Sequence, residues 1–370
     1  MSTTYYYLTY FIFLLIVVPQ AHSQEEEFDV DLVIDYSAAE QCIRLFEDQF
    51  VNTEDVAGLR GNRIATSTTG MIESNGIGAY LLKNNLDTLK HRQYFQKDVY
   101  NLEDAKRNAV AIREMLDELK RRNFSRRVVA TVEQIFPHDV EVSAKIPVYV
   151  VALGHENVDA YVRRIVWQGD EPRFVGENEG ELTIVINLAQ AVKYSDNLEE
   201  RFVELLGVVA HEVFHAAFGV YKENSSTWKR YEQKHQRPID ILLDLTHNEG
   251  IAYYLSLDQQ GRGNLPRDWN SRMREVFITF NNNAKELLSP NTTGARLSEL
   301  IRSANLSGFW ESYGSMAGMY IARTIDKQLG RAALIETISN GPMDFFQKYI
   351  ELSKDDAALP KLTTKVTKEH

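Results

Sequence analysis

Two spacings of apolar residues divide the first half of the chain into helical and strand-like stretches. Residues 36–60 and 76–136 repeat apolar positions every three or four residues, as a helix does when it buries one face. Short, continuous apolar runs are typical of strands, and they follow at 146–151, at 182–188 and, more weakly, at 161–167. The first half is therefore expected to contain helices and a small sheet.

The second half is helical in pattern almost throughout. Residues 221–237 are polar, and we expect them to form an excursion over the cleft. A helix is predicted to begin at Pro238, and further helical patterns follow at 269–288, 297–304 and in a segment that ends at Leu329. The whole pattern predicts an α+β fold that is mostly helical.

This division suggests a domain organisation. We expect an N-terminal α+β lobe of residues 24–220, a helical C-terminal lobe of residues 221–360 and a flexible tail of residues 361–370. With 370 residues, 44% of them hydrophobic and 25% charged, the chain has a globular composition and can bury a large core. A net charge of −11 and the lack of a basic arm argue against a nucleic-acid partner.

The N-terminus has the features of a secretory signal. Residues 5–18 are mostly apolar and uncharged, and the small residues Ala21 and Ser23 suit a cleavage site near Ser23/Gln24. No lysine or arginine precedes the run, so an uncleaved anchor is the alternative, although the run is short for a bilayer span. We expect a secreted or periplasmic protein with no stable membrane span after signal removal. Its single cysteine, Cys42, excludes an intramolecular disulfide.

The candidate chemistry lies in one predicted helix, which begins near Asp196 and is expected to end at Gly219. His211 and His215 are four residues apart, so their imidazoles share one helix face and can hold a zinc ion between them. Glu212 follows the first histidine, where a carboxylate reaches a metal-bound water and acts as a general base. The alternative is a helix with two ordinary histidines.

A catalytic zinc site needs a third protein ligand. The metzincin spacing is excluded, because Phe218 and Tyr221 stand where that pattern requires glycine and histidine. Glu249 is the better candidate, since the small residues Gly250 and Ala252 allow its helix to approach the first one closely. Burying a lone carboxylate is costly without a cation. Zinc would supply that cation, and a salt bridge to an arginine is the alternative.

These residues resemble the gluzincin metallopeptidases, in which His211-Glu212-x-x-His215 would be followed by Asn248-Glu249-Gly250-x-Ala252. The resemblance implies a zincin-like fold with a small sheet beside the motif helix, one Zn²⁺ ion bound by His211, His215 and Glu249, and Glu212 as the base. A longer part of the chain is similar to an uncharacterised bacterial family of zinc-dependent peptidases, from Ile34 to the helix that contains Tyr313-Gly314-x-Met316-Ala317 and the tail of that helix. That similarity supports the metal and implies no particular substrate.

The sequence leaves alternatives for two further roles, the strand that pairs with substrate and the donor that stabilises the oxyanion. In gluzincins a sheet edge beside the zinc pairs with extended substrate, and the strand at 182–188 is either this edge or an internal strand. An oxyanion donor is also needed opposite the base. Tyr313 is our first candidate, followed by Tyr320, His235 and Tyr253, and each of them is otherwise a packing residue.

The functional prediction is a secreted zinc peptidase that cleaves peptide or protein substrates with a metal-activated water. The alternative from another class is a non-catalytic secreted protein that keeps a zincin fold for binding or structure. A structural zinc is closed by a fourth side chain, and His247 or Asp244 directed at the metal would favour that alternative. A metallohydrolase with a different kind of substrate is a third possibility.

Overall fold

The computed structural model describes residues 28–363 apart from 74–78, 94, 96, 177–178, 261–267 and 306–311. The described chain is mostly helical and has one five-stranded mixed sheet, which confirms the predicted α+β, mostly helical fold class. The expected signal sequence, residues 1–23, and residues 364–370 of the expected tail lie outside the described residues.

The sheet has the strand order β1-β2-β5-β3-β4. Its strands are β1 (Phe28–Asp35), β2 (Val142–Val151), β3 (Ala160–Gln168), β4 (Glu171–Phe174) and β5 (Glu181–Asn187). The pairs β1–β2 and β2–β5 are parallel, and the pairs β5–β3 and β3–β4 are antiparallel. Strand β5 therefore lies between β2 and β3. Of the two alternatives for residues 182–188, the internal strand is correct, and the substrate-pairing edge is wrong at this position.

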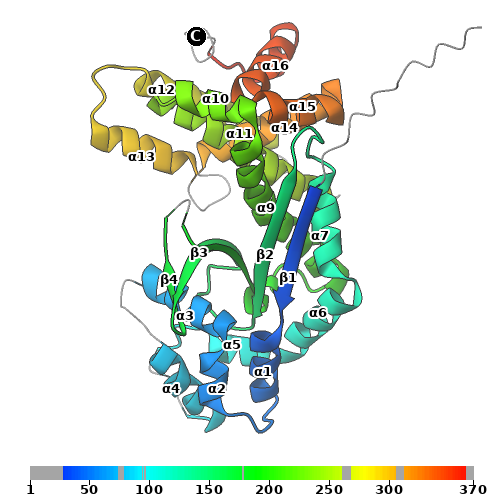
Figure 1. The fold of residues 1–370 in the computed structure, drawn as a ribbon, viewed down its shortest axis with the longest axis vertical. Helices are drawn as coiled ribbons and strands as arrows, with labels where there is room; N and C mark the ends of the chain where they lie inside the picture. The colour runs from blue at the N-terminus through cyan, green and yellow to red at the C-terminus, as the bar shows by residue number, and fades with distance from the viewer. Residues whose placement is uncertain are drawn as a thin grey trace, which may run out of the picture.

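Among the described residues, seven helices precede β2 and a short one follows β5. They are α1 (Ser37–Phe46), α2 (Thr53–Gly58), α3 (Arg60–Ile72), α4 (Ala79–Lys90), α5 (Leu102–Arg107), α6 (Ala109–Arg121), α7 (Phe124–Glu133) and α8 (Leu188–Ala191). Helix α7 packs against β1, and α1 and α3 pack against β2. In Figure 1 helices α1 to α6 gather at one end of the sheet, and α7 runs alongside β1.

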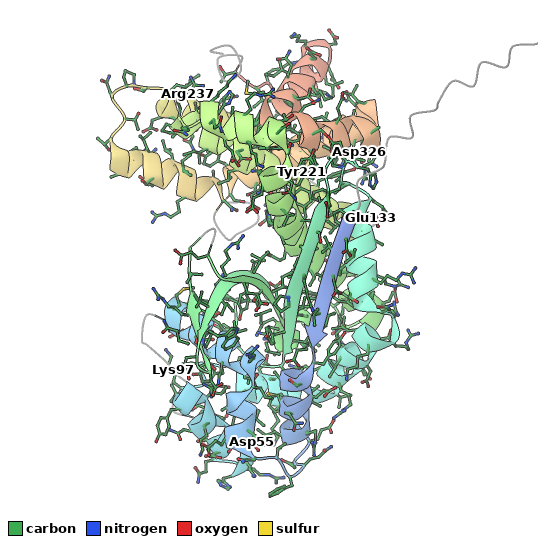
Figure 2. All side chains as sticks on the ribbon, in the orientation of Figure 1. Asp55, Lys97, Glu133, Tyr221, Arg237 and Asp326 are labelled. Atoms are coloured by element: carbon green, nitrogen blue, oxygen red, sulfur yellow. The ribbon has the colours of Figure 1, made fainter. Side chains whose placement is uncertain are left out.

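Helix α9 (Leu198–Asn224) carries the two histidines and connects the halves of the molecule (Figure 1). The Asn197 side chain caps it by accepting a hydrogen bond from the backbone amide of Glu200, close to the predicted start. The predicted end at Gly219 is wrong, because the helix continues for another turn past the expected lobe boundary. Tyr221, labelled in Figure 2, is buried in this last turn and donates a hydrogen bond to Asp139, just ahead of β2.

The apolar character of α9 reflects its place in the core. It packs against α7, α11 and β2, and its buried side chains include Phe202, Val209, Val213 and Phe214. Among the described helices it alone is long and apolar enough to cross a membrane, and 61% of its most apolar window is buried inside the protein. This burial explains the composition without a membrane.

The C-terminal half consists of helices. They are α10 (Ser226–Lys234), α11 (Pro238–Gln260), α12 (Trp269–Leu287), α13 (Gly294–Ala304), α14 (Tyr313–Leu329), α15 (Arg331–Asn340) and α16 (Pro342–Asp355). The polar segment after residue 221 is helical rather than an irregular excursion. Ser225 caps α10, and the indole of Trp228 is fully buried, donating to the carbonyl of Ile338. A buried aromatic anchor thus fixes a stretch whose composition is polar.

Helix α11 is wedged between α9 and α14 by glycines that let backbones meet. A Cβ atom built on Gly250 would overlap the backbone of Gly318, and one built on Gly318 would overlap the backbone carbonyl of Thr246. On the other side of α11, Gly207 of α9 faces the backbone of Ser256, whose hydroxyl donates to the Gly207 carbonyl at 2.8 Å. Glu249 is therefore held in place by close contacts on both sides of its helix.

The glycine contact between α11 and α14 yields a stability prediction. Replacing Gly250 with alanine should lower the free energy of unfolding by about 1–3 kcal/mol or more, because the new methyl group meets backbone that cannot move aside. Gly219→Ala is the matched control in a helix interior. Nothing lies within 4 Å of its built Cβ, so it should raise stability by about 0.5–1 kcal/mol. Chemical denaturation measures both, and equal effects at the two positions would contradict the packing described.

Candidate metal centre

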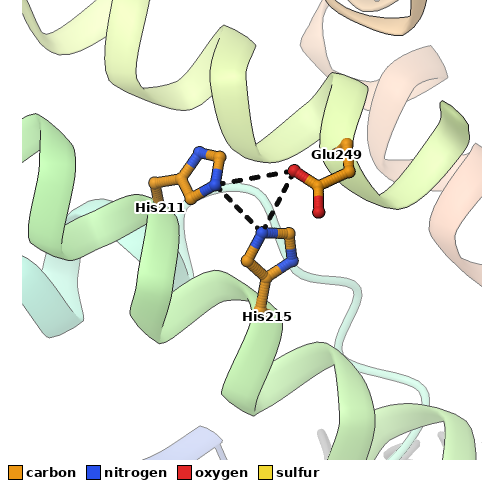
Figure 3. Close-up of side chains that lie close together, drawn as sticks. All are labelled: His211, His215 and Glu249. Atoms are coloured by element: carbon orange, nitrogen blue, oxygen red, sulfur yellow. Dashed lines mark hydrogen bonds and ion pairs between the residues drawn. The ribbon is translucent and has the colours of Figure 1, made fainter. Parts of the chain in front are cut away.

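The two histidines and the later glutamate meet where α9 crosses α11. The Nε2 atoms of His211 and His215 are 3.0 Å apart. The Oε2 atom of Glu249 is 3.7 Å from the first and 3.5 Å from the second. Figure 3 shows the two rings and the carboxylate converging on one point. Their possible ligand atoms all lie within 4.8 Å of one another, so the three side chains could hold one metal ion.

Each of the three side chains is partly buried, with 13% of His211, 22% of His215 and 13% of Glu249 exposed. Burial, together with the charge on the other ring, lowers the pKa of His211 to about 3. Burial alone would lower the pKa of His215 as well, but the Glu249 carboxylate raises it to about 9. One ring therefore stays neutral while the other holds a proton, and a metal ion binding here must displace that proton.

Hydrogen bonds from neighbouring residues orient all three candidate ligands. Nδ1 of His215 lies 3.0 Å from Oδ1 of Asn248, so that nitrogen donates, and Nε2, which faces the cluster, is the atom that can bind a metal once its proton has left. His211 is hydrogen-bonded to the backbone of Ala252. The second carboxylate oxygen of Glu249 accepts from Asn305 at 2.7 Å, leaving the other oxygen toward the rings. Metal-binding histidines in proteins are commonly fixed in this way.

Glu212 occupies the next position on the same helix and is also buried. Burial raises the pKa of its carboxyl group to about 7, and the charges of Glu249 and Asp159 add to the increase. His215 and Arg163 act in the opposite direction. A carboxyl group with this pKa accepts and returns protons with nearly equal ease at neutral pH.

An open cleft lies beside the cluster. It has a volume of about 740 Å³ and is lined by His215 and Glu249, by residues 162–164 of β3, and by further residues of α9 and α11. The cleft gives a solvent-side ligand access to the side chains that converge in Figure 3.

The four aromatic candidates for oxyanion donor lie in different surroundings. Tyr253 packs its ring against His211, with centroids 4.5 Å apart, and its position four residues after Glu249 places it on the same face of α11. The Tyr313 hydroxyl donates to the Leu300 carbonyl at 2.8 Å instead of toward the cluster. Tyr320 packs among aromatic residues, and the ring of His235 stacks on Tyr231.

The two side chains that would close the site as a structural zinc are directed elsewhere. His247 is fully buried against Phe345, with Nε2 3.3 Å from the Thr337 hydroxyl. Asp244 forms an ion pair with Lys222 at 2.5 Å. Within the described part of the chain, the metal-binding group consists of the three side chains named above. This donor set leaves room for a non-protein ligand.

Sequence reasoning did not identify the orienting asparagines. Asn248 belongs to the motif, but the motif does not indicate its hydrogen bond to His215. Asn305 is distant from Glu249 in the sequence, and no sequence pattern indicates that the two side chains meet. Tyr253 follows Glu249 by four residues and so shares its helix face, and this spacing could have identified Tyr253 as the first candidate for the oxyanion donor.

The chain matches a known protein family. A family model with the description "Putative zinc dependent peptidase (DUF5700)" matches residues 54–358, which include both described halves and every residue of the cluster. No curated protein and no solved structure matches the chain.

The hydrogen bond between His215 and Asn248 yields a binding prediction. Asn248→Ala should weaken zinc affinity by about 10- to 100-fold, because the His215 ring loses the acceptor that fixes its tautomer and direction. Asn248→Asp keeps an acceptor at this position and should recover most of the affinity. Asn282→Ala, at an exposed position of α12, is the control. Competition with a chromophoric chelator measures all four proteins, and wild-type affinity in Asn248→Ala would refute the orienting role.

Proposed function

The chain belongs to this family of zinc-dependent peptidases, and we propose that it is a secreted enzyme that hydrolyses peptide bonds with one zinc ion. In this proposal the metal is held by His211, His215 and Glu249. Glu212 is the general base. The observation that carries the proposal is the convergence of two imidazoles and one carboxylate beside an open cleft.

The donor set fits zinc. Tetrahedral zinc with bonds of about 2.1 Å separates its ligand atoms by about 3.4 Å. The three separations in the cluster are 3.0, 3.5 and 3.7 Å, close to that requirement without rearrangement of the helices. Two nitrogen donors and one carboxylate oxygen are also a common ligand set of catalytic zinc.

When bound, zinc supplies a Lewis acid that polarises the substrate carbonyl and makes a water molecule easier to deprotonate at neutral pH. Glu212 takes the proton from the attacking water and passes it to the leaving amine, and its raised pKa of about 7 suits both transfers. Tyr253 is the best-placed of the aromatic candidates to donate to the developing oxyanion, since its ring contacts His211. Tyr313, the first candidate from sequence, would have to exchange its hydrogen bond to the Leu300 carbonyl to take this role.

A free part of the sheet edge supports binding of an extended peptide. Strand β4 pairs with β3 only at residues 165–168, and Val175 continues this pairing by donating to the carbonyl of Arg164. On that side of β3, residues 160–163 have no partner strand among the described residues. Val162 alternates with Arg164 along the strand, so its backbone groups face the same edge, and it lines the cleft. Its carbonyl already accepts a hydrogen bond from Nη1 of Arg163, so its N–H is the group left for a peptide. A peptide strand added here would lie beside the candidate metal centre.

Export is part of the proposal and rests on the sequence of residues 1–23. An uncharged apolar run followed by small residues near Ser23 is the pattern that signal peptidases recognise. The rival of a closed structural zinc is not favoured by any contact of Asp244 or His247.

A conservative substitution tests the mechanism. Glu212→Gln should keep zinc bound at one ion per chain and lower kcat on peptides by about 10²- to 10⁴-fold, because the amide cannot take a proton from water. Glu114→Gln, at an exposed position of α6, is the matched control and should behave as wild type. The assay is mass-spectrometric detection of cleavage in a peptide library. Unchanged peptide cleavage in Glu212→Gln would refute this base, and a wild-type protein that retains zinc without cleaving any peptide would refute the peptidase proposal.

A further inference from the structure

Arg163 is a cationic residue in the wall of the cleft. It extends from β3 and lines the same cleft as His215 and Glu249. Two aromatic rings hold its guanidinium group, whose central carbon lies 4.9 Å from the centroid of Tyr161 and 5.7 Å from that of Phe174. One terminal nitrogen, Nη1, donates to the carbonyl of Val162 at 2.8 Å. The group is thus held in a fixed position.

The positive charge of Arg163 is not neutralised by an ion pair among the described residues, and only some of its N–H donors make hydrogen bonds. Among the described residues no carboxylate forms an ion pair with Arg163, whereas Lys222 in the same cleft is paired with Asp244. The Nε atom of Arg163 is buried and has no hydrogen-bond partner in the described part of the chain. Aromatic faces compensate a guanidinium charge but accept no conventional hydrogen bond in its plane. The other terminal nitrogen, Nη2, makes no hydrogen bond among the described residues either and is not enclosed as Nε is, so it is the donor that a ligand in the cleft can reach.

The guanidinium also acts electrostatically on the reaction centre. Its charge is among those that oppose the raised pKa of Glu212, and Tyr161 lies on the same strand beside it. Neighbouring Arg164 lines the cleft too, again with no ion pair among the described residues, while Glu223 and Glu232 line another part of it. The wall contributed by β3 is therefore positive and unneutralised.

We propose that Arg163 binds a carboxylate of the substrate next to the scissile bond, so that the enzyme prefers peptides with an acidic group there. A carboxylate presents two oxygens that match the planar donor fork of arginine, and Nη1 is already used within the chain. The carboxylate comes either from an aspartate or glutamate side chain or from a free C-terminus. This inference rests on the proposed peptidase function and specifies its substrate class.

Four peptides distinguish the two sources. They carry glutamate or glutamine after the cleavage site identified in the library, each with a free or an amidated C-terminus. The wild-type zinc enzyme should cleave one carboxylate-bearing member with a kcat/KM about tenfold or more above its neutral counterpart. The member that shows the preference identifies the source.

Variants then assign the preference to a residue. In Arg163→Met the ratio of acidic to neutral kcat/KM should fall to about one, and Arg163→Lys should keep part of it. Arg126→Met, at an exposed position of α7, should leave the ratio as in wild type. An unchanged ratio in Arg163→Met, an equal loss on acidic and neutral peptides, or loss of the preference only in Arg164→Met would each overturn the assignment. Thermal unfolding verifies that the variants are folded.

A binding measurement separates this inference from the peptidase proposal. Calorimetry on zinc-loaded Glu212→Gln should show tighter binding of the preferred carboxylate peptide than of its neutral counterpart, with or without turnover in the wild type. Adding Arg163→Met should remove this difference. If the difference persists in the double variant, the carboxylate binds elsewhere, for instance at the metal, and the role of Arg163 is refuted even where peptides are cleaved.

Discussion

The structure depends on a carboxylate buried beside two imidazoles. Withdrawing Glu249 from water is costly unless a positive charge compensates it, and the same holds for a protonated His215. Without metal, a proton on His215 supplies that charge, because the Glu249 carboxylate raises the pKa of this ring. A divalent cation compensates the carboxylate better than a proton does, because the proton is held by one ring and the cation binds both imidazoles and the carboxylate. The centre is therefore arranged around a cation before any substrate binds.

The surrounding fold holds this arrangement by close helix contacts. Gly207 brings α9 against Ser256 of α11, and Gly250 brings α11 against Gly318 of α14, so that Glu249 lies between two backbone contacts. Tight packing of this kind resists small displacements of the helices. A metal site needs this rigidity, because its ligand atoms must be placed to within a fraction of an ångström. Of the asparagines that orient the ligands, Asn248 lies in α11 and Asn305 caps the C-terminal end of α13. The sheet contributes the opposite wall of the cleft, where Arg163 is held between aromatic rings.

Much of this could be predicted from sequence, and the failures have physical causes. Helical periodicity located α11 to α14 closely. The four-residue spacing of the two histidines, and the small residues that follow Glu249, identified three side chains that do converge. Gly219 did not end α9, because tertiary burial of Tyr221 outweighs the helix propensity of one glycine. The internal position of the strand at 182–188 could not be predicted, because no local pattern in the sequence specifies which strands pair with it. The positions of Asn305 and Arg163 relative to the centre depend on such long-range pairings as well.

The most direct test of the central claim is a zinc-loaded crystal structure with anomalous diffraction at the zinc edge. The account predicts one strong zinc peak per chain, within about 2.0–2.2 Å of Nε2 of His211, Nε2 of His215 and a carboxylate oxygen of Glu249. Clear density for zinc bound by other side chains, or by the two histidines with Glu249 turned away, would contradict it.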